Sequence, residues 1–370
     1  MPEINHIEIA VCERLLHEWS PASHLIRCDA LVPDASLRRY YRLFYTDGLA
    51  SSQEKSIVSV IYDSTRAPEA GGGQISIAAD EAFVSLARFF SENGIAVPRV
   101  YAGDSESHIY LLEDLGSTPL FSIVGSDAGC PTSARDPEKI ISGYSQAIAQ
   151  MLRLQAIRAN DHIFIFQRFF SEATLLTEME ETVDYLLPDR GCSVSFRDRV
   201  RQVLPDIAAA VARLPRALVH RDFHSWNLLI DGNEDVRVID FQDSLIGPRA
   251  YDLASLLNDR DTDSALGDAL VMQLVDAFKK ESGFGSEVLL EYALVLLQRD
   301  LKVAGRFAKL ATLRGLDAYR KWIPGTLRRI GRSLAFLSAN SSMGFLNGEF
   351  LALLSGEIEE VEAGAHSPLF

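Results

Sequence analysis

The stretch Leu218 to Asp243 reads LVHRDFHSWNLLIDGNEDVRVIDFQD. Its second half predicts a β-hairpin, because the Asp-Gly pair that starts at Asp231 separates two apolar runs, and this is a strong hairpin signal. The hairpin places Asn227 at its entry and Asp240 at the end of its second strand, while Asp222 lies one loop turn before Asn227. The pattern therefore predicts that three oxygen-bearing side chains converge.

Three such oxygens suit Mg²⁺ and a phosphoryl donor. Mg²⁺ takes few protein ligands, mostly carboxylate or amide oxygens, and fills its other positions with water and phosphate. The protein-kinase pattern H-R-D-x-x-x-x-N is matched by His220, Arg221, Asp222 and Asn227, and Asp240 stands where that pattern has a second metal-binding Asp. We expect Asp222 to accept the proton of the attacking hydroxyl, and Asn227 and Asp240 to bind Mg²⁺. A surface hairpin with ordinary turn acids is the alternative interpretation.

The motif and its surroundings resemble a known family. HRDFHSWNLL (220–229) and VIDFQDSLIGPRAYDLASLL (238–257) are similar to the aminoglycoside phosphotransferase and choline kinase branch of the protein-kinase-like fold. Within this branch, three further stretches resemble the bacterial kinases that phosphorylate C1 of N-acetylmuramate and N-acetylglucosamine. These stretches are DASLRRYYR (34–42), LLEDLG (111–116) and QRDLKV (298–303).

The resemblance runs from about residue 30 to about residue 330 and implies an α+β, bilobal protein-kinase-like fold with an antiparallel sheet lobe before a mainly helical lobe. We expect a nucleotide-covering lobe at 1–112, a hinge at 113–116, and a catalytic and acceptor-binding lobe at 117–370.

The same resemblance implies an ATP- and Mg²⁺-dependent small-molecule kinase, most similar to those that act on the anomeric C1 hydroxyl in cell-wall sugar recycling. Two alternatives remain open: a kinase of an aminoglycoside, choline or homoserine-like alcohol, and a catalytically silent pseudokinase that acts as a binding module.

The loop expected over the ATP phosphates departs from the protein-kinase pattern. Residues 34–39 contain no glycine, so close approach of the main chain to phosphate is less assured. Side chains then have to supply the contacts, and we expect Ser36 and either Arg38 or Arg39 to do so, because arginine forms bidentate bonds with phosphate. The alternative is that both arginines are solvated strand ends.

A second departure concerns the strand expected at 56–62. Protein kinases carry a Lys there that pairs with a helix Glu, whereas here Lys55 lies just before the strand. Glu81, at the start of a helix expected at 79–93, has no evident partner on that strand. The amino-sugar kinases also lack this Lys, so the departure fits the resemblance.

The hinge is expected to bind adenine. Strands predicted at 97–101 and 108–113 lead into it, and in the family the main-chain groups of this segment bind the adenine edge. Glu113 and Leu115 are our candidates, and a plain polar loop is the alternative. The resemblance further implies that His220 supports the catalytic loop and that Asp252 accepts hydrogen bonds that hold it.

Acceptor binding is assigned to two helices. The helix expected at 169–187 has a possible N-cap at Ser171 and carries acids that would ordinarily face solvent; the resemblance suggests that Glu178 contacts the acceptor. The helix expected at 287–311 carries basic residues at helical spacing. A solvated face is the usual explanation, but Arg299 is a candidate to bind a carboxylate on the acceptor.

Composition excludes several other functions. The net charge of −15 argues against nucleic acid and against an anionic membrane surface. Four widely spaced cysteines without a C-x-x-C motif predict neither a disulfide framework nor a zinc site. The Gly71-Gly72-Gly73 stretch lacks a following G-K-[ST] and is interpreted as a linker.

We expect a cytoplasmic protein, since no leader or membrane span is evident, and we find no sign of an obligate protein partner. Further helices are expected at 5–19, 137–158, 197–214 and 264–280.

Overall fold

The computed structural model describes residues 4–31, 38–48, 53–62, 79–124, 136–160, 162–260 and 262–340. The chain divides into two compact units. Unit 1 contains the residues up to 118, apart from 71–73, together with 229–242, and unit 2 contains the remainder. The hairpin that follows the catalytic motif therefore packs with the N-terminal residues, although its neighbours in the sequence belong to unit 2.

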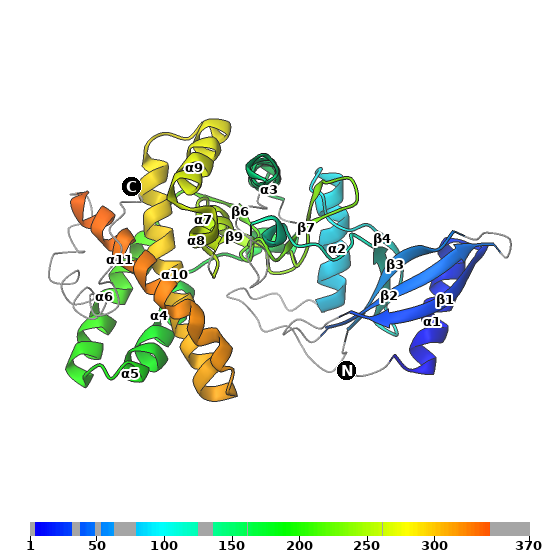
Figure 1. Ribbon diagram of the computed structural model, residues 1–370, viewed down its shortest axis with the longest axis horizontal. Helices are drawn as coiled ribbons and strands as arrows, with labels where there is room; N and C mark the ends of the chain where they lie inside the picture. Colours follow the sequence, from blue (N-terminus) through cyan, green and yellow to red (C-terminus); the bar gives the residue numbers. More distant parts are fainter. Residues whose placement is uncertain are drawn as a thin grey trace. The chain divides into compact units, whose positions relative to one another are not determined.

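Unit 1 is built on an antiparallel sheet with the strand order β1-β2-β3-β5-β4 (Figure 1). The strands are β1 (Ser23–Ala30), β2 (Arg38–Asp47), β3 (Lys55–Tyr62), β4 (Val100–Asp104) and β5 (Ile109–Glu113). This confirms the sheet that we predicted for the N-terminal half. The sequence does not predict β1, because it is an edge strand whose exposed residues break the two-residue alternation.

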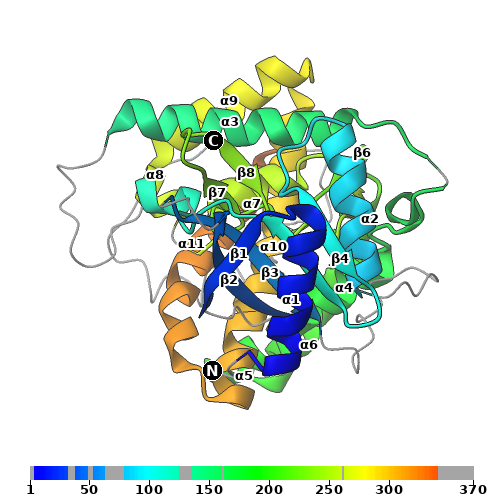
Figure 2. The same cartoon turned by 90° about the vertical axis from the view of Figure 1, so that its right-hand side faces the viewer.

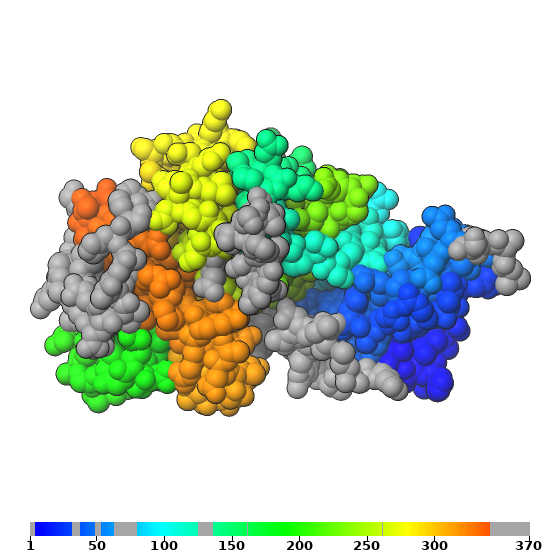
Figure 3. Space-filling model, viewed as in Figure 1, coloured from blue at the N-terminus to red at the C-terminus, as the bar shows by residue number. Residues whose placement is uncertain are grey.

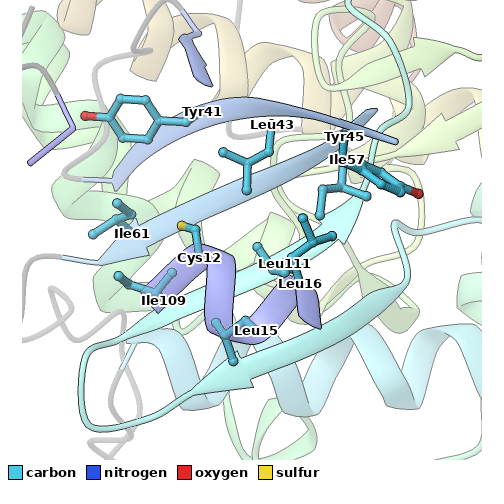
Figure 4. Packing of buried hydrophobic residues seen from close by; sticks show 10 residues of the cluster. All are labelled: Cys12, Leu15, Leu16, Tyr41, Leu43, Tyr45, Ile57, Ile61, Ile109 and Leu111. Carbon is cyan, nitrogen blue, oxygen red and sulfur yellow. The ribbon is translucent and has the colours of Figure 1, made fainter. Parts of the chain in front are cut away.

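Helix α1 (His6–Trp19) covers one face of this sheet (Figure 4). It begins at Asn5, whose side chain forms a capping box with Glu8. The Sγ atom of Cys12 lies 3.3 Å from Oγ of Ser59 on β3. The remaining members of this buried cluster are Leu15, Leu16, Tyr41, Leu43, Tyr45, Ile57, Ile61, Ile109 and Leu111. On β3, Ile57, Ser59 and Ile61 alternate with residues that point to the other face, so all three face α1.

Unit 1 also holds the hairpin and the residues that follow it. The hairpin consists of β7 (Leu228–Ile230) and β8 (Val236–Val238). After it, Phe241 stacks on Phe83 of α2 (Ala79–Glu92) with 5.1 Å between ring centroids, and meets Phe90 edge-on at 5.6 Å. These contacts fix the main chain at Asp240.

Unit 2 is mainly helical, as predicted. The 28-residue helix α10 (Glu287–Arg314) is buried over much of its length and runs through the middle of the unit (Figures 1 and 2). The residues from α9 to α11, coloured yellow to orange, form much of the described part of unit 2 on the face shown in Figure 3. The other helices of the unit are α3 (Pro137–Ala156), α4 (Glu172–Glu181), the π-helical turn η4 (Thr182–Leu186), α5 (Leu187–Asp189), α6 (Val194–Ala212), α7 (Tyr251–Asn258), α8 (Thr262–Leu266), α9 (Asp268–Ser282) and α11 (Ile323–Ala339). None of the described helices is long and apolar enough to cross a membrane.

Helix α10 and the turn η4 approach each other closely at Gly305. A Cβ atom at this position would lie 2.3 Å from the main-chain nitrogen of Thr182, which is far inside van der Waals contact. Glycine is required here because the backbones of the two elements are nearly in contact. The spacing between α10 and the end of α4 is therefore fixed.

The core beneath the sheet provides a stability test. Leu15 is fully buried in the α1 cluster, so Leu15→Ala should lower the free energy of unfolding by about 2–5 kcal/mol through lost burial and a residual cavity. Ile7 lies on the same helix with 78% of its surface exposed, and Ile7→Ala should leave the stability nearly unchanged. Denaturant titrations followed by circular dichroism measure both. Equal effects of the two substitutions would show that α1 does not pack as described.

Candidate active site

The catalytic loop of unit 2 is placed by a short pair of strands. Strand β6 (Arg216–Val219) pairs antiparallel with β9 (Leu245–Pro248) and ends directly before His220. Gly247 makes this pairing possible, because a Cβ there would lie 2.8 Å from both Phe170 and Val219. Helix α7 follows β9, so its first turn lies beside the start of the loop.

Asp252, in that first turn, binds the main chain of the loop. Its Oδ2 accepts a hydrogen bond from the N–H of His220 at 2.6 Å, and its Oδ1 accepts one from the N–H of Arg221 at 3.0 Å. Burial raises the pKa of Asp252 to about 6, although the charge of His220 and the two N–H groups oppose the rise. The two hydrogen bonds join Asp252 to the loop, and its role in holding the loop for catalysis stays a prediction.

Asn227 is oriented by the same loop. Its Nδ2 donates to the carbonyl oxygen of Asp222 at 3.0 Å and lies 3.4 Å from Nε2 of His224. Because the amino side of the amide faces the loop, the carbonyl side is the one available to a ligand. An amide oxygen is a ligand that Mg²⁺ accepts, and the binding of Mg²⁺ by Asn227 stays a prediction.

In unit 1, Asp240 lies beside Arg38. The Nη2 atom of Arg38 is 2.6 Å from Oδ1 of Asp240, and Nε2 of Gln242 donates to the same oxygen at 2.8 Å. Asp240 adopts a positive φ of 63°, which is uncommon for a residue other than glycine. The packing of Phe241 against α2 holds the chain in this conformation. The first residue of β2 thus supplies a cation next to the predicted metal ligand.

The neighbouring arginine has a different partner. Arg39 forms an ion pair with Glu8 of α1, with Nη1 3.1 Å from Oε2. Of the two arginines that the sequence proposed for phosphate, only Arg38 therefore lies at Asp240. Ser36, the third candidate in this loop, lies outside the described residues.

The hinge is braced by the hairpin. Nη2 of Arg237, on β8, lies 2.8 Å from Oε2 of Glu113, and its Nη1 lies 3.0 Å from Oδ2 of Asp231. The N–H of Glu113 donates to the carbonyl of Arg99 at 2.8 Å, so this donor is already used within the sheet. Leu115 is buried. The adenine contacts of Glu113 and Leu115 stay predictions.

The acid that α2 directs at the sheet is Asp80 rather than Glu81. Asp80 lies 2.7 Å from Nδ1 of His108 and accepts a hydrogen bond from the hydroxyl of Tyr110 at 2.8 Å, whereas Glu81 is exposed. Lys55 is the first residue of β3 and pairs with Asp47 at the exposed end of the sheet. Sequence reasoning missed Asp80, since neither His108 nor Tyr110 is close to it along the chain.

Glu178 is not at the solvent face of α4, contrary to one of our expectations for its acids. It is buried, with Oε1 2.9 Å from Nζ of Lys302 and 3.2 Å from Nη2 of Arg221. Nε2 of Gln298 lies 3.4 Å from its other oxygen. Its carboxylate is thus surrounded by groups of the protein itself. Its expected contact with the acceptor stays a prediction.

Arg299 is also buried, with 4% of its surface exposed. Its Nη2 donates to Oγ of Ser255 at 2.8 Å and lies 3.5 Å from Oδ1 of Asp259. Burial lowers the pKa of Arg299, but the charges of Asp259 and of other acids that include Asp222 raise it overall. Arg299 is therefore a cation within electrostatic range of the catalytic candidate.

Comparison with known proteins identifies the family. The model of the phosphotransferase enzyme family, APH, matches residues 77–292, which is more than half of the chain. The chain belongs to this family. Membership makes it an ATP-dependent kinase with a hydroxyl group as acceptor.

Two relatives and two solved structures extend this result. The phosphotransferase is 28% identical over 319 residues to the N-acetylmuramate/N-acetylglucosamine kinase of Neisseria meningitidis, with 82% of this chain and 86% of the relative covered. It is 27% identical over 300 residues to the kinase of the same name from Pseudomonas putida, with coverages of 77% and 79%.

Among solved structures, ADP-bound aminoglycoside phosphotransferase APH(2'')-Ib matches with a TM-score of 0.57 and 12% identity, covering 86% of this chain and 97% of that one. Choline kinase LicA from Streptococcus pneumoniae matches with a TM-score of 0.55 and 12% identity, with coverages of 90% and 100%. At these identities the structures show the shared kinase-like fold.

The donor set of the phosphotransferase suits a metal that takes few protein ligands. Among the described residues, no three His, Cys, Asp or Glu side chains gather as a metal site. The amide oxygen of Asn227 and the carboxylate of Asp240 are both hard oxygen donors, which Mg²⁺ prefers. Each of the two side chains therefore has the donor chemistry that suits Mg²⁺, whereas structural zinc centres mostly use nitrogen and sulfur ligands; their joint role as metal ligands stays a prediction.

We expect Asp252 to make the activity of the phosphotransferase dependent on pH. Below a pH of about 6 its carboxyl gains a proton, one oxygen becomes a donor facing an N–H group, and we expect kcat to fall as the pH decreases. The folded state binds this proton more tightly than the unfolded state does. The protonated carboxyl of Asp252 therefore stabilises the folded state below a pH of about 4, and this stabilisation is lost as the pH rises through about 6.

Asp252→Asn tests this assignment. The variant offers only one acceptor oxygen to two N–H groups, which costs about 1–3 kcal/mol, so kcat should fall at neutral pH and the fall of kcat near pH 6 should disappear. Asp276→Asn on the exposed face of α9 is the control. ADP release from pH 5 to 8 is the measurement, and an unchanged profile in Asp252→Asn would contradict the role.

Proposed function

We propose that the protein phosphorylates the anomeric C1 hydroxyl of N-acetylmuramate or N-acetylglucosamine, as a step in cell-wall sugar recycling. The observation that carries this proposal is the match to kinases of that name over more than three quarters of both chains in N. meningitidis and P. putida. Membership of the family gives an ATP-dependent kinase with a hydroxyl acceptor, and both sugars carry such a hydroxyl. The family alone leaves the identity of the acceptor open.

In this proposal Asp222 orients the acceptor hydroxyl and accepts its proton, while Asp252 and His220 hold the loop that carries it. Asn227 and Asp240 hold Mg²⁺. Mg²⁺ held there would supply positive charge that offsets the negative charge developing during transfer. The main task of the chain is positioning, since a loose phosphoryl-transfer transition state makes little demand on a strong base.

The nucleotide is assigned to unit 1 in the same proposal, with residues 1–112 as its covering lobe, 113–116 as the hinge and 117–370 as the catalytic and acceptor-binding lobe. Ser36 and Arg38 bind phosphate oxygens, and main-chain groups of Glu113 and Leu115 bind adenine. The 2.6 Å contact between Arg38 and Asp240 supports the phosphate role, because it puts a guanidinium next to the predicted metal ligand. Arg38 thus takes the place of the strand lysine of protein kinases, because Lys55, the first residue of β3, pairs with Asp47 instead.

A negatively charged acceptor group fits the cations near Asp222. Lys302 is already paired with Glu178, whereas the pKa of Arg299 is raised by several acids that include Asp222. Arg299 therefore favours the lactyl carboxylate of N-acetylmuramate over a cationic acceptor such as choline or an aminoglycoside, which calls for an acidic site. We retain Arg299 as the candidate for that carboxylate.

The proposal is tested by ADP release from the purified protein with Mg-ATP and, in turn, N-acetylglucosamine, N-acetylmuramate, kanamycin, choline and homoserine. We expect turnover with the two sugars and an acid-labile C1 phosphate as the product. Asp222→Ala is the blank and should lower kcat steeply while ATP still binds. Asp240→Ala should also lower kcat, and should weaken Mg-ATP binding.

Three results would contradict the assignment. Turnover with a cationic alcohol alone would remove the proposed acceptor while leaving the kinase. Activity of Asp222→Ala or Asp240→Ala comparable with that of the unaltered protein would remove the proposed roles. A sugar phosphate stable to mild acid would place the transfer at a hydroxyl other than C1.

Arg38 and Arg39 provide a matched pair for the phosphate role, because they are neighbours on β2 with different partners. Arg38→Ala should raise the Kd of Mg-ATP by about tenfold or more, since a charge-assisted contact is worth about 1.5–3 kcal/mol. Arg39→Ala removes a partner of Glu8 and Tyr41 and should leave the Kd nearly unchanged. Calorimetric titration with a non-hydrolysable ATP analogue and Mg²⁺ measures both. The reverse order of effects would assign phosphate to Arg39.

A further inference from the structure

Glu178 connects three elements of unit 2: α4, α10 and the catalytic loop. It lies on α4, and its Oε1 contacts both Nζ of Lys302 on α10, at 2.9 Å, and Nη2 of Arg221 in the catalytic loop, at 3.2 Å. Gln298, one helical turn before Lys302, approaches its other oxygen at 3.4 Å. An ionised carboxylate with 9% of its surface exposed is stable only when it is paired in this way.

Arg221 needs support because of its backbone conformation. It precedes Asp222 and has a φ of 80°, in the left-handed region that costs free energy for residues with a Cβ atom. Asp252 holds its main-chain N–H, and Glu178 holds its guanidinium. One residue is therefore fixed at both its main chain and its side chain by two buried acids.

We infer that Glu178 is a positioning residue, which fixes Arg221 and through it the main chain at Asp222, and that it does not bind the acceptor. The inference rests on the proposed function of Asp222. It also revises the acceptor role that the resemblance suggested for Glu178.

The surroundings of Glu178 support this inference. Burial raises the pKa of its carboxyl, but the charges of Lys302 and Arg221 outweigh burial and lower it overall, so the side chain stays ionised and paired. The close contact at Gly305 fixes α10 against the end of α4, one turn after Lys302. A shift of Glu178 towards a ligand would leave two cations without their shared anion in a buried place.

The same helix provides a matched control. Glu181, three residues further along α4, also binds two cations of α10, with Oε2 2.7 Å from Nε of Arg306 and Oε1 2.9 Å from Nζ of Lys309. Both acids join α4 to α10, but only Glu178 also contacts the catalytic loop. Comparing Glu178→Gln with Glu181→Gln therefore separates support of the loop from support of the helix pair.

We expect Glu178→Gln to lower kcat by about 10- to 100-fold, because a small misplacement of a catalytic group has an effect of this size. The KM values for Mg-ATP and for the acceptor should stay within about twofold, and Glu181→Gln should change none of the three by more than this. Arg221→Met should lower kcat similarly, and its effect should not add to that of Glu178→Gln. If Glu178→Gln does not fold, Glu178→Asp keeps the charge, shortens the reach and should show the same loss.

Three outcomes would overturn the inference. A raised acceptor KM with unchanged kcat in Glu178→Gln would show direct contact with the acceptor. Equal effects of the Glu178 and Glu181 substitutions would show a role in helix packing alone, and additive effects with Arg221→Met would show that the two residues act separately.

A readout without turnover distinguishes failure of this inference from failure of the proposed function. Hydrogen exchange of the His220 and Arg221 amides should become faster in Glu178→Gln and not in Glu181→Gln. If the unaltered protein transfers phosphate to none of the acceptors, the proposed acceptor is wrong, and the exchange rates still decide whether Glu178 positions the loop. Unchanged exchange in Glu178→Gln would overturn the inference.

Discussion

The carboxylate of Asp252 is the group on which the catalytic half of the molecule depends. A fully buried acid is costly unless its oxygens are bonded, and here each oxygen accepts one main-chain N–H of the loop. The pairing of β6 with β9 brings α7 to the place where this is possible. Glu178 binds the side chain of Arg221, and Asp252 binds the main-chain N–H of the same residue. The conformation before Asp222 is thus determined by two acids from helices on either side of the loop in the sequence.

In unit 1 the packing of an aromatic ring fixes the main chain beside the predicted metal ligand. Phe241 packs against two phenylalanines of α2, and this contact holds the preceding Asp240 in an unusual backbone conformation beside Arg38. Arg237 ties the hairpin to the hinge through Glu113. Internal packing and ion pairs within each unit therefore fix the candidate site residues that the unit contains. The chain needs neither a glycine-rich loop nor a lysine on β3 to bring a cation to Asp240.

Much of this arrangement can be predicted from the sequence, because the signals are local. The Asp-Gly turn predicts the hairpin, the spacing from His220 to Asn227 predicts the catalytic loop, and helical spacing predicts α10. The residues that were misjudged depend on distant partners. Glu178 looks like an exposed acid on an amphipathic helix, and the two cations that pair with it, Arg221 and Lys302, are both distant in the sequence. Strand β1 is formed from a mostly exposed sequence by pairing with β2, which no local pattern reveals.

The placement of the hairpin has a consequence for synthesis of the chain. Unit 1 is discontinuous, since residues 229–242 complete it after more than a hundred residues of unit 2. During translation, α2 can therefore form its contact with Phe241, and the hinge its contact with Arg237, only after these two residues have emerged from the ribosome. Domains that are continuous in sequence fold as they emerge, whereas here the first unit is finished only when nearly half of the second has been translated. An N-terminal fragment that ends at the hinge lacks part of its own core.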